Sequence, residues 1–212
     1  MTRPLVKVCG ITRVGDAEAA LRLGVELLGL NFYAESPRSI EVAEAVRLRR
    51  RIGDRARVVG VFVNHPRLEV ERIAGEVGLD LLQFHGDEGP CDLEPFGARA
   101  IKVFRVAGPL PHDEIAAYGA AWGFLFDSER ARAYGGTGAR WAWEEAGPLP
   151  AGRPALVAGG IRPDNVRELL ARLSPWGIDV GSGVESAPGH KDPALMERLF
   201  EEIAHAQDAR VT

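Results

Sequence analysis

A cysteine ends an apolar run near the start of the chain, in the segment Val6-Lys7-Val8-Cys9-Gly10. The run predicts a β-strand, and the glycine after it lets the backbone turn and leaves space beside the sulfur. A thiol at a strand exit stands where α/β proteins build their sites, and its thiolate form is the reactive one. Most buried cysteines are inert packing residues, so Cys9 alone leaves both interpretations open.

Polar side chains and glycines also follow the other apolar runs of the chain. A buried polar group costs stability unless it is hydrogen-bonded, so core strands do not require such a density of polar residues. We therefore expect a site assembled at the strand exits, which offer Cys9, Asn31, Asn64 and His65, Gln83 and His85, Arg105, Asp127, Gly159 and Gly160, and Asp179 to Gly183. His65 precedes Pro66 and is left out of the site as a residue that caps the next helix.

Short apolar runs alternate with segments of helical period along the whole chain. The expected strands are Val6–Cys9, Leu28–Phe32, Val58–Val63, Leu81–Phe84, Ala100–Val106, Phe124–Asp127, Ala155–Ala158 and Ile178–Val180. The expected helices are Gly15–Leu23, Val42–Ile52, Leu68–Val77, Pro90–Phe96, Asp113–Tyr118, Trp141–Ala146, Pro163–Leu173 and Pro193–Gln207. About eight strand-then-helix units predict an α/β fold, a (β/α)8 TIM barrel over residues 1–207 with a tail at 208–212. The main alternative is an open doubly wound sheet, which normally has fewer repeats and a glycine fingerprint that is missing after Cys9.

The composition narrows the choice of partners and location. The chain has 212 residues, is 46% hydrophobic and carries a net charge of -4, so nothing favours nucleic acid or an anionic membrane as a partner. It has neither a run of ~20 apolar residues nor a signal-peptide pattern, and we expect a cytoplasmic protein with free thiols at Cys9 and Cys91. Cys91 is away from any strand exit and is expected to be a packing residue.

Three glycine clusters follow the sixth, seventh and eighth expected strands. Backbone N–H groups in such loops can converge on an anion, and barrels often bind phosphate beside the last two strands. One cluster alone is equally well explained as a tight turn that needs positive φ. Three clusters at successive strand exits favour a phosphate site made from Gly136, Thr137, Gly138, Gly159, Gly160, Gly181, Ser182 and Gly183.

The segment Lys7-Val8-Cys9-Gly10-Ile11-Thr12 resembles the N-terminal signature of the phosphoribosylanthranilate isomerase family. Glycine loops are shared with many sugar-phosphate barrels, whereas this signature combined with a Gln-x-His-Gly motif is far more specific. Further matches follow in order over nearly the whole chain: Asn31-Phe32, Ser36-Pro37-Arg38, Gly60-Val61-Phe62, Gln83-Phe84-His85-Gly86, Phe126-Asp127-Ser128, Gly135-Gly136-Thr137-Gly138, Gly159-Gly160 with Asn165-Val166, and Asp179 to Glu185.

The resemblance implies an isomerase of tryptophan biosynthesis. Its reaction is the Amadori rearrangement of N-(5-phosphoribosyl)anthranilate to 1-(2-carboxyphenylamino)-1-deoxyribulose 5-phosphate, which needs no cofactor and no metal. The resemblance implies Asp127 as the general acid that protonates the ring oxygen and Cys9 as the general base that takes the proton from the sugar C2. It also makes Arg38, otherwise interpreted as a surface arginine, a candidate to hold the anthranilate carboxylate by two hydrogen bonds. Further substrate-binding residues are expected at Gln83, His85, Arg105 and Asp179, with His85 as a satisfied buried histidine the alternative.

Both catalytic assignments set electrostatic conditions. A thiol with an ordinary pKa of about 8.5 needs positive potential to act as a base near neutral pH. Lys7 lies on the same strand face and either tunes Cys9 or forms a structural ion pair in the barrel. Asp127 has to hold a proton part of the time, which a neighbouring carboxylate such as Asp179, or the anionic groups of the substrate, would favour.

Departures from the family pattern concern hydroxyl groups: Thr137, Ala158 and Gly181 stand where serine is common. The backbone donors remain, so the phosphate site is expected although its detailed contacts are open. Members of the family occur as monomers and dimers, and a homodimer is an open expectation. Three aromatic residues that we expect in exposed loops either mark an interface or line the pocket: Phe32, Tyr33 and Trp141.

Three other functions remain as alternatives. A metal-dependent pentose-phosphate epimerase would use His65, His85, Asp127 and Asp179 as ligands. A Schiff-base aldolase would need a desolvated lysine at Lys7 or Lys102. A silent phosphosugar-binding subunit would have no need of both Cys9 and Asp127.

Overall fold

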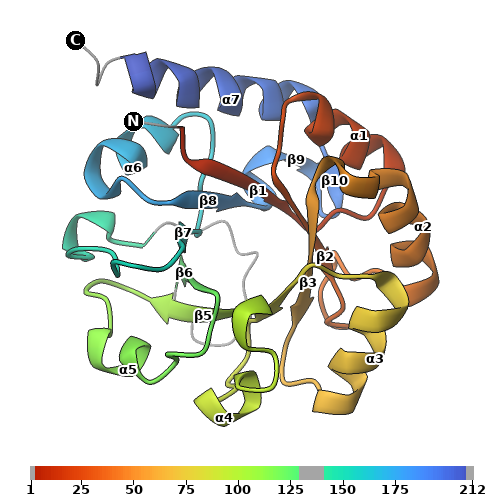
Figure 1. Cartoon of the computed structure of the whole chain (residues 1–212). Coiled ribbons are helices and arrows are strands. Elements are labelled where there is room, and N and C mark those ends of the chain that lie inside the picture. The colour runs from red at the N-terminus through yellow and green to blue at the C-terminus, as the bar shows by residue number, and fades with distance from the viewer. Residues whose placement is uncertain (1–2, 129–140, 209–212) are drawn as a thin grey trace.

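Eight parallel strands close into one barrel (Figure 1) in the computed structural model, which describes residues 3–128 and 141–208. The strands are β1 (Leu5–Cys9), β2 (Leu27–Asn31), β3 (Arg57–Phe62), β4 (Leu81–Phe84), β5 (Ala100–Val106), β6 (Gly123–Ser128), β7 (Ala155–Val157) and β8 (Gly177–Val180). They pair in chain order, and β8 returns to β1 with Val6 opposite Ile178 and Lys7 opposite Asp179. The expected parallel barrel is confirmed.

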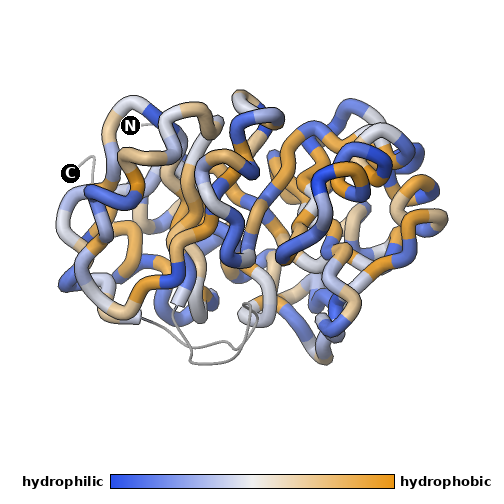
Figure 2. Tube along the Cα trace, turned by 90° about the horizontal axis from the view of Figure 1, so that it is seen from below, coloured by the Kyte–Doolittle hydropathy of each residue, from blue (hydrophilic) through white to orange (hydrophobic). Residues whose placement is uncertain are grey.

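Helices surround the barrel (Figure 1). They are α1 (Val14–Arg22), α2 (Val42–Ile52), α3 (Arg67–Val77), α4 (Pro90–Leu93), α5 (His112–Ala116), α6 (Val166–Leu173) and α7 (Pro193–Asp208). Each longer helix turns an apolar stripe to the strands, as Ala45, Leu48 and Ile52 do on α2. Figure 2 shows the same division, with apolar residues along the strands and polar residues on the outer helix faces.

Three expected helices are wrong in extent or in kind, and one of them, Pro163–Leu173, begins only at Val166. The fourth ends at Leu93 instead of Phe96, because Pro95 has no backbone N–H with which to donate the next helical hydrogen bond. In the expected helix Trp141–Ala146, only a short 3-10 turn forms, at Trp143–Glu145. Gly147 at φ 71° and the prolines that follow it prevent the helix from continuing.

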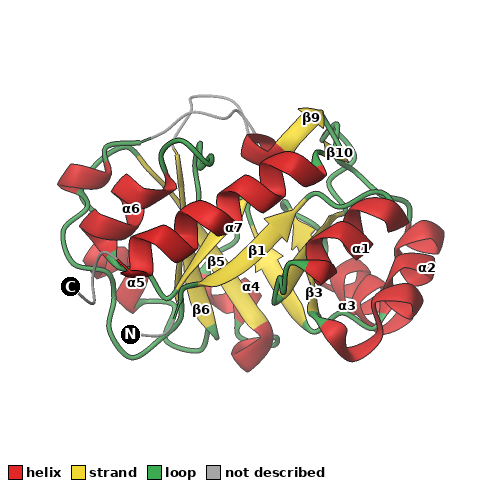
Figure 3. Ribbon diagram, turned by 90° about the horizontal axis from the view of Figure 1, so that it is seen from above, coloured by secondary structure: helices red, strands yellow, loops and turns green. Residues whose placement is uncertain are grey.

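A short antiparallel hairpin follows β8 and was not expected from the sequence. Its strands are β9 (Glu185–Ala187) and β10 (His190–Lys191), and Gly189 turns between them at φ 78°. The hairpin lies at the end of the barrel toward which the strand arrows point (Figure 3). It therefore stands at the rim where the strand exits gather.

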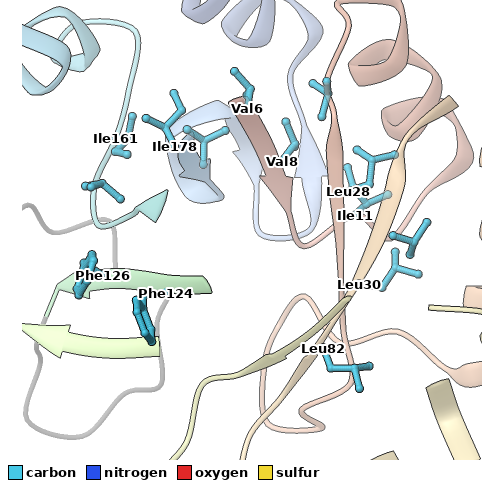
Figure 4. Close-up of a cluster of buried hydrophobic side chains, with 14 of the residues drawn as sticks. Val6, Val8, Ile11, Leu28, Leu30, Leu82, Phe124, Phe126, Ile161 and Ile178 are labelled. Carbon is cyan, nitrogen blue, oxygen red and sulfur yellow. The ribbon is translucent and has the colours of Figure 1, made fainter. Parts of the chain in front are cut away.

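Two apolar cores fill the molecule, one between strands and helices and one inside the barrel. Figure 4 shows part of the outer core, which includes Val6, Val8, Leu28 and Ile178. The inner core contains Leu27, Val59, Leu81, Ile101, Val103, Leu125, Leu156 and Ala158. Because alternate strand residues face the same side, the inner positions continue toward the rim as polar residues. Leu81 is followed by Gln83 and His85, Leu125 by Asp127, and Leu5, which packs against this core, by Lys7 and Cys9.

Candidate active site

Cys9 lies at the carboxyl end of β1, on the inner face of the barrel, where the neighbouring strand has a glycine. Gly29 is opposite Cys9 on β2, and a Cβ on Gly29 would lie 2.8 Å from Cys9 Sγ and 3.2 Å from Lys7 Nζ. The thiol and the ammonium therefore approach the same point above this glycine. Any side chain at position 29 would displace one of them.

Lys7 is fully buried and donates a hydrogen bond to Asp179, with 2.9 Å between Nζ and Oδ1. Burial disfavours the charge on Lys7, but the Asp179 carboxylate and the Cys9 sulfur outweigh it and raise the Lys7 pKa. Lys7 is thus an ion-pair partner and a neighbour of the thiol at once. The two interpretations that the sequence left open describe the same side chain.

The surroundings of Cys9 favour its protonated form. Burial is the largest effect and raises the pKa of the thiol, and the Asp179 carboxylate acts in the same direction. Lys7 and Lys191 lower the pKa, but not enough to bring it back to its ordinary value. Lys7 and Lys191 supply the positive potential that a base at this position requires, but they only partly offset the effects that raise the Cys9 pKa.

Asp127 lies one residue before the end of β6, hydrogen-bonded to the backbone and close to His85. Its Oδ1 accepts a hydrogen bond of 2.7 Å from the backbone N–H of Ser128, and its Oδ2 lies 3.4 Å from Nε2 of His85. Gly159 permits this arrangement, since a Cβ there would lie 3.2 Å from Asp127 Oδ1 and 2.9 Å from Ser128 N. The carboxyl group is therefore fixed at the rim, beside an imidazole.

Gln83 lies beneath His85 rather than at the open rim. Its side chain is buried, and Nε2 lies 3.1 Å from His85 Nδ1. With Gln83 Nε2 donating to Nδ1, the neutral imidazole carries its proton on Nε2, the atom that faces Asp127. The three side chains form a row from Gln83 through His85 to Asp127.

Arg38 lies on the loop after β2 and is not a surface arginine, because only 12% of its side chain is exposed. Its stem passes directly over Gly10, where a Cβ would come within 2.7 Å of Arg38 Cδ. The space that glycine leaves next to Cys9 is thus filled by this side chain. Nε and Nη2 of Arg38 donate to the carboxylate of Glu185, at 2.9 Å to Oε1 and 2.7 Å to Oε2.

The loops after β7 and β8 pack against each other at the expected phosphate position. Gly159 and Gly160 adopt φ of 87° and 64°, so their turn needs glycine for backbone reasons as well. A Cβ on Gly183 would collide with the carbonyl oxygen of Ile161, which shows how closely the two loops approach. Asn165 Nδ2 fixes the first loop by donating to Gly160 O at 2.9 Å. The third expected loop, with Gly136, Thr137 and Gly138, lies outside the described residues.

Other expected site residues find local partners. Arg105 Nη2 pairs with Asp87 Oδ1 on the loop after β4. His65 contacts the backbone of Val63 and the ring of Phe62, so it does not join His85 and Asp127. Within residues 3–128 and 141–208, no three His, Cys, Asp or Glu side chains are placed to hold a metal ion. In the same ranges no helix is long and apolar enough to cross a membrane.

Several expectations about individual side chains are wrong. Phe32 stacks on Phe62 at 5.3 Å and is buried, and Trp141 is buried with Nε1 donating to Ala158 O at 3.1 Å. Neither is therefore an exposed loop residue. Cys91 is exposed on α4 and does not pack in the core.

Sequence reasoning missed a second group of charged side chains at the rim, Glu185 and Lys191. The sequence feature that could have pointed to them is the scarcity of lysine among the basic residues. Among 26 basic side chains the chain has only three lysines, and Lys7, Lys102 and Lys191 are all buried. The molecular surface uses arginine alone, and lysine occurs only inside.

Comparisons with known proteins agree over the whole barrel. The family model described as N-(5'phosphoribosyl)anthranilate (PRA) isomerase matches residues 6–202. The N-(5'-phosphoribosyl)anthranilate isomerase of Bordetella avium is 42% identical, and the alignment covers 97% of this chain and 98% of that protein. The phosphoribosyl anthranilate isomerase structure from Thermus thermophilus has a TM-score of 0.86 at 39% identity, covering 95% of this chain and 98% of the other.

Two further solved structures bear on ligand and assembly. One is a phosphoribosyl anthranilate isomerase in complex with reduced 1-(o-carboxyphenylamino)-1-deoxyribulose 5-phosphate, at TM-score 0.79 and 27% identity over 95% of this chain and 99% of that one. The other is a monomer generated from the dimeric enzyme of Thermotoga maritima, at TM-score 0.79 and 26% identity with the same coverage. The family model spans most of this chain, and the relative from Bordetella avium is 42% identical over 97% of it. The protein belongs to the N-(5'-phosphoribosyl)anthranilate isomerase family.

Proposed function

We propose that this protein converts N-(5'-phosphoribosyl)anthranilate into 1-(2-carboxyphenylamino)-1-deoxyribulose 5-phosphate, with Asp127 as general acid and Cys9 as general base. One observation carries the assignment of roles. Cys9 and Asp127 end two strands of one parallel barrel on its inner face, so both side chains border the same mouth. Each is accompanied by a polar partner, Lys7 beside the thiol and His85 beside the carboxyl group.

The reaction needs two proton transfers at different atoms of the sugar. Protonated Asp127 gives its proton to the furanose ring oxygen, the bond from that oxygen to C1 breaks, and a Schiff base forms with the anthranilate nitrogen. The Cys9 thiolate then removes the proton from C2, and the electron pair moves toward the iminium nitrogen to give an enolamine. Protonation at C1 and loss of the hydroxyl proton at C2 yield the ketone product. No electron is gained or lost overall.

The two anionic ends of the substrate have separate recognition elements. The loops after β7 and β8 supply backbone at Gly159, Gly160, Gly181, Ser182 and Gly183 for the phosphate, and Gly136, Thr137 and Gly138 would complete that site. The guanidinium of Arg38 is the partner of the anthranilate carboxylate, and its burial supports this role. The reacting sugar atoms would then lie between the two ends.

The remaining expected site residues divide into two groups. His85 and Arg105 stand at the rim, where we assign them to contact with substrate. Gln83 and Asp179 are buried and hydrogen-bonded to His85 and Lys7, so we assign them support of those two side chains rather than direct contact with substrate. Supporting groups of this kind fix the tautomer and the orientation of the residue that acts.

The assembly and location of the enzyme are proposals too. A homodimer is supported by the dimeric relative from Thermotoga maritima, although burial of Phe32 and Trp141 removes two of the three aromatic residues that could have formed an interface. Light scattering would give twice the chain mass of 22.9 kDa for a dimer. We assign the enzyme to the cytoplasm, where its substrate would be made.

The activity itself is tested by generating phosphoribosylanthranilate in situ and following its fluorescence after adding the protein. Rapid loss of fluorescence, with formation of the ketose phosphate product, is expected. A folded protein that leaves the fluorescence unchanged would contradict the proposed reaction.

A further inference from the structure

The β9–β10 hairpin carries two charged side chains that are buried at the rim of the barrel, Glu185 and Lys191. Neither is assigned a role by the reaction described above. They meet Arg38, which comes from the loop after β2, 147 residues earlier than Glu185. The exposed fractions of the Arg38, Glu185 and Lys191 side chains are 12%, 4% and 0%.

The carboxylate of Glu185 is shared between the two cations. Its Oε1 accepts from Arg38 Nε at 2.9 Å and from Lys191 Nζ at 2.7 Å. Its Oε2 accepts from Arg38 Nη2 at 2.7 Å. Two parallel bonds from one guanidinium edge fix the plane of the guanidinium as well as its position. Among the described residues, Nη1 of Arg38 has no hydrogen-bond partner.

The hairpin is itself fastened to the loops around Cys9. Lys191 Nζ also donates to Gly181 O at 3.1 Å, and the backbone N–H of Lys191 donates to Asp16 Oδ2 at 3.0 Å. Thr12 Oγ1 donates to the carbonyl of Gly189 at 2.6 Å. The group that orients Arg38 is therefore anchored to α1 and to the loops after β1 and β8, which surround the reacting thiol.

The charges in this cluster do not cancel. Burial favours the neutral form of Glu185, but Arg38 and Lys191 outweigh it and hold the pKa of Glu185 below its usual value. When Lys191 is protonated, two cations face one carboxylate and one positive charge remains in a poorly hydrated place; burial lowers the pKa of Lys191 and so opposes that charge. A single anionic group of the substrate would neutralise it.

We propose that Glu185 is a positioning residue for Arg38, holding one edge of the guanidinium so that Nη1 faces an arylcarboxylate, with Lys191 keeping Glu185 in place. The ligand class is an N-aryl sugar phosphate with a carboxylate on the ring, and the cluster selects against the same molecule without that carboxylate. This inference rests on the proposed function, because Arg38 is the carboxylate partner only if the substrate carries one.

The variant Glu185→Gln separates orientation from simple charge neutralisation. Removing the carboxylate leaves two cations at the site, so a residue that only neutralises charge would give tighter binding of an anionic ligand when replaced. A residue that orients Arg38 would give weaker binding, because the amide cannot accept from both cations and Arg38 loses its fixed plane. The two roles therefore predict opposite signs.

Two ligands are compared by calorimetry: reduced 1-(o-carboxyphenylamino)-1-deoxyribulose 5-phosphate and the same compound without the carboxyl group. For E185Q we expect the Kd of the carboxylated ligand to rise about tenfold or more, and the Kd of the phenyl ligand to stay within about twofold. In the background of Arg38→Met, which keeps the stem over Gly10, E185Q should add no further loss. In steady-state assays KM should rise more than kcat falls, because the carboxylate is bound in ground and transition states alike.

A surface pair provides the matched control. Glu18→Gln also removes a carboxylate shared by two arginines, Arg51 and Arg55, and should leave both Kd values unchanged. If E185Q does not fold, Glu185→Asp keeps the charge and retracts the carboxylate, and it should show the same ligand-selective loss.

Equal weakening of both ligands, or tighter binding of the carboxylated one, would overturn the positioning role. Failure of the proposed function would look different: the wild-type protein would then not distinguish the carboxylated ligand from the phenyl ligand, or would bind neither.

Discussion

Lys7 Nζ lies 2.9 Å from Asp179 Oδ1 at a fully buried point inside the barrel, and the two residues are opposite each other in the β1–β8 register. The same ammonium group approaches the point above Gly29 that Cys9 Sγ also approaches. A strand-to-strand ion pair and the environment of the thiol are therefore one arrangement. Changing either charge has to change the chemistry of the cysteine.

Replacing Asp179 and replacing Lys7 should change the pKa of Cys9 in opposite directions. Asp179→Asn removes a negative charge that raises the pKa of Cys9, and Lys7→Met removes a positive charge that lowers it. In a Cys91→Ser background, alkylation of Cys9 by iodoacetamide at fixed pH should be faster in the first variant and slower in the second. Each variant should also be destabilised by about 3–5 kcal/mol, because a buried partner charge is left behind. Rates that move in the same direction would show that packing, not charge, dominates.

The reactivity of the Cys9 thiol in the free enzyme should increase with pH above neutrality. Because burial and Asp179 raise the pKa of Cys9, the free enzyme holds the thiol proton at neutral pH, and the thiolate fraction grows about tenfold per pH unit below the raised pKa. The measurement is the rate of Cys9 alkylation by iodoacetamide between pH 6.5 and 9 in a Cys91→Ser background at constant ionic strength, because turnover also requires protonated Asp127. A flat profile over that range would mean that the thiol is already ionised at neutral pH.

Removal of either catalytic group should abolish turnover without abolishing binding. Cys9→Ala and Asp127→Asn are each expected to lower kcat by about 10²-fold or more, the usual range for loss of general base or general acid catalysis. The Kd of the reduced product analogue should change little, because the phosphate loops and Arg38 are untouched. Near-normal turnover in one variant would remove that residue from its assigned role.

Gly29 should be more important to the reaction than its lack of a side chain suggests. Gly29→Ala would place a methyl group 2.8 Å from Cys9 Sγ, so kcat should fall steeply. Gly60→Ala is the matched control, because its methyl group would collide with Leu79 Cδ1 and Phe62 Cε2, both in the outer core. Both variants should lose about 1–3 kcal/mol of stability through overpacking. Equal kcat values in the two variants would show that Gly29 has no specific role at the active site.

Gln83→Leu should act through His85. Without the amide, His85 Nδ1 loses its donor, and the proton is no longer held on the nitrogen that faces Asp127. We expect kcat to fall about tenfold with a small change in KM, and unfolding to become about 1–3 kcal/mol easier. A kcat equal to that of the wild type, at normal folded content, would restrict Gln83 to packing.

The barrel could be predicted because the sequence shows both the two-residue period of the strands and the helical period of about 3.6 residues. Leu81, Gln83 and His85 alternate with outward residues, and Ala45, Leu48 and Ile52 follow the helical period. The expected helices Pro90–Phe96 and Trp141–Ala146 do not form in full, because Pro95 cannot donate the next helical hydrogen bond and Gly147 stops the second segment after a single turn. Helix-breaking residues therefore ended both segments.

The charged cluster of Arg38, Glu185 and Lys191 could not be predicted from the sequence, for a different reason. Its hairpin strands are three and two residues long, too short to show a period, and its ion pairs join Arg38 to residues far away in sequence. The Gln83–His85 contact was similarly hidden, since two polar residues on one strand face look the same whether each meets substrate or one supports the other. Only the rarity of lysine in the sequence pointed to buried charged positions such as Lys191.

With all three lysines inside the protein, the surface exposes no side-chain amine. Ring-opened aldose phosphates react spontaneously with free amines to form imines, and the ring-opened substrate of this enzyme, itself an imine, can exchange its amine for another. Arginine guanidinium groups, protonated at all accessible pH values, keep the surface charged while resisting that condensation. The protein should therefore survive prolonged contact with reducing sugar phosphates without accumulating glycated side chains.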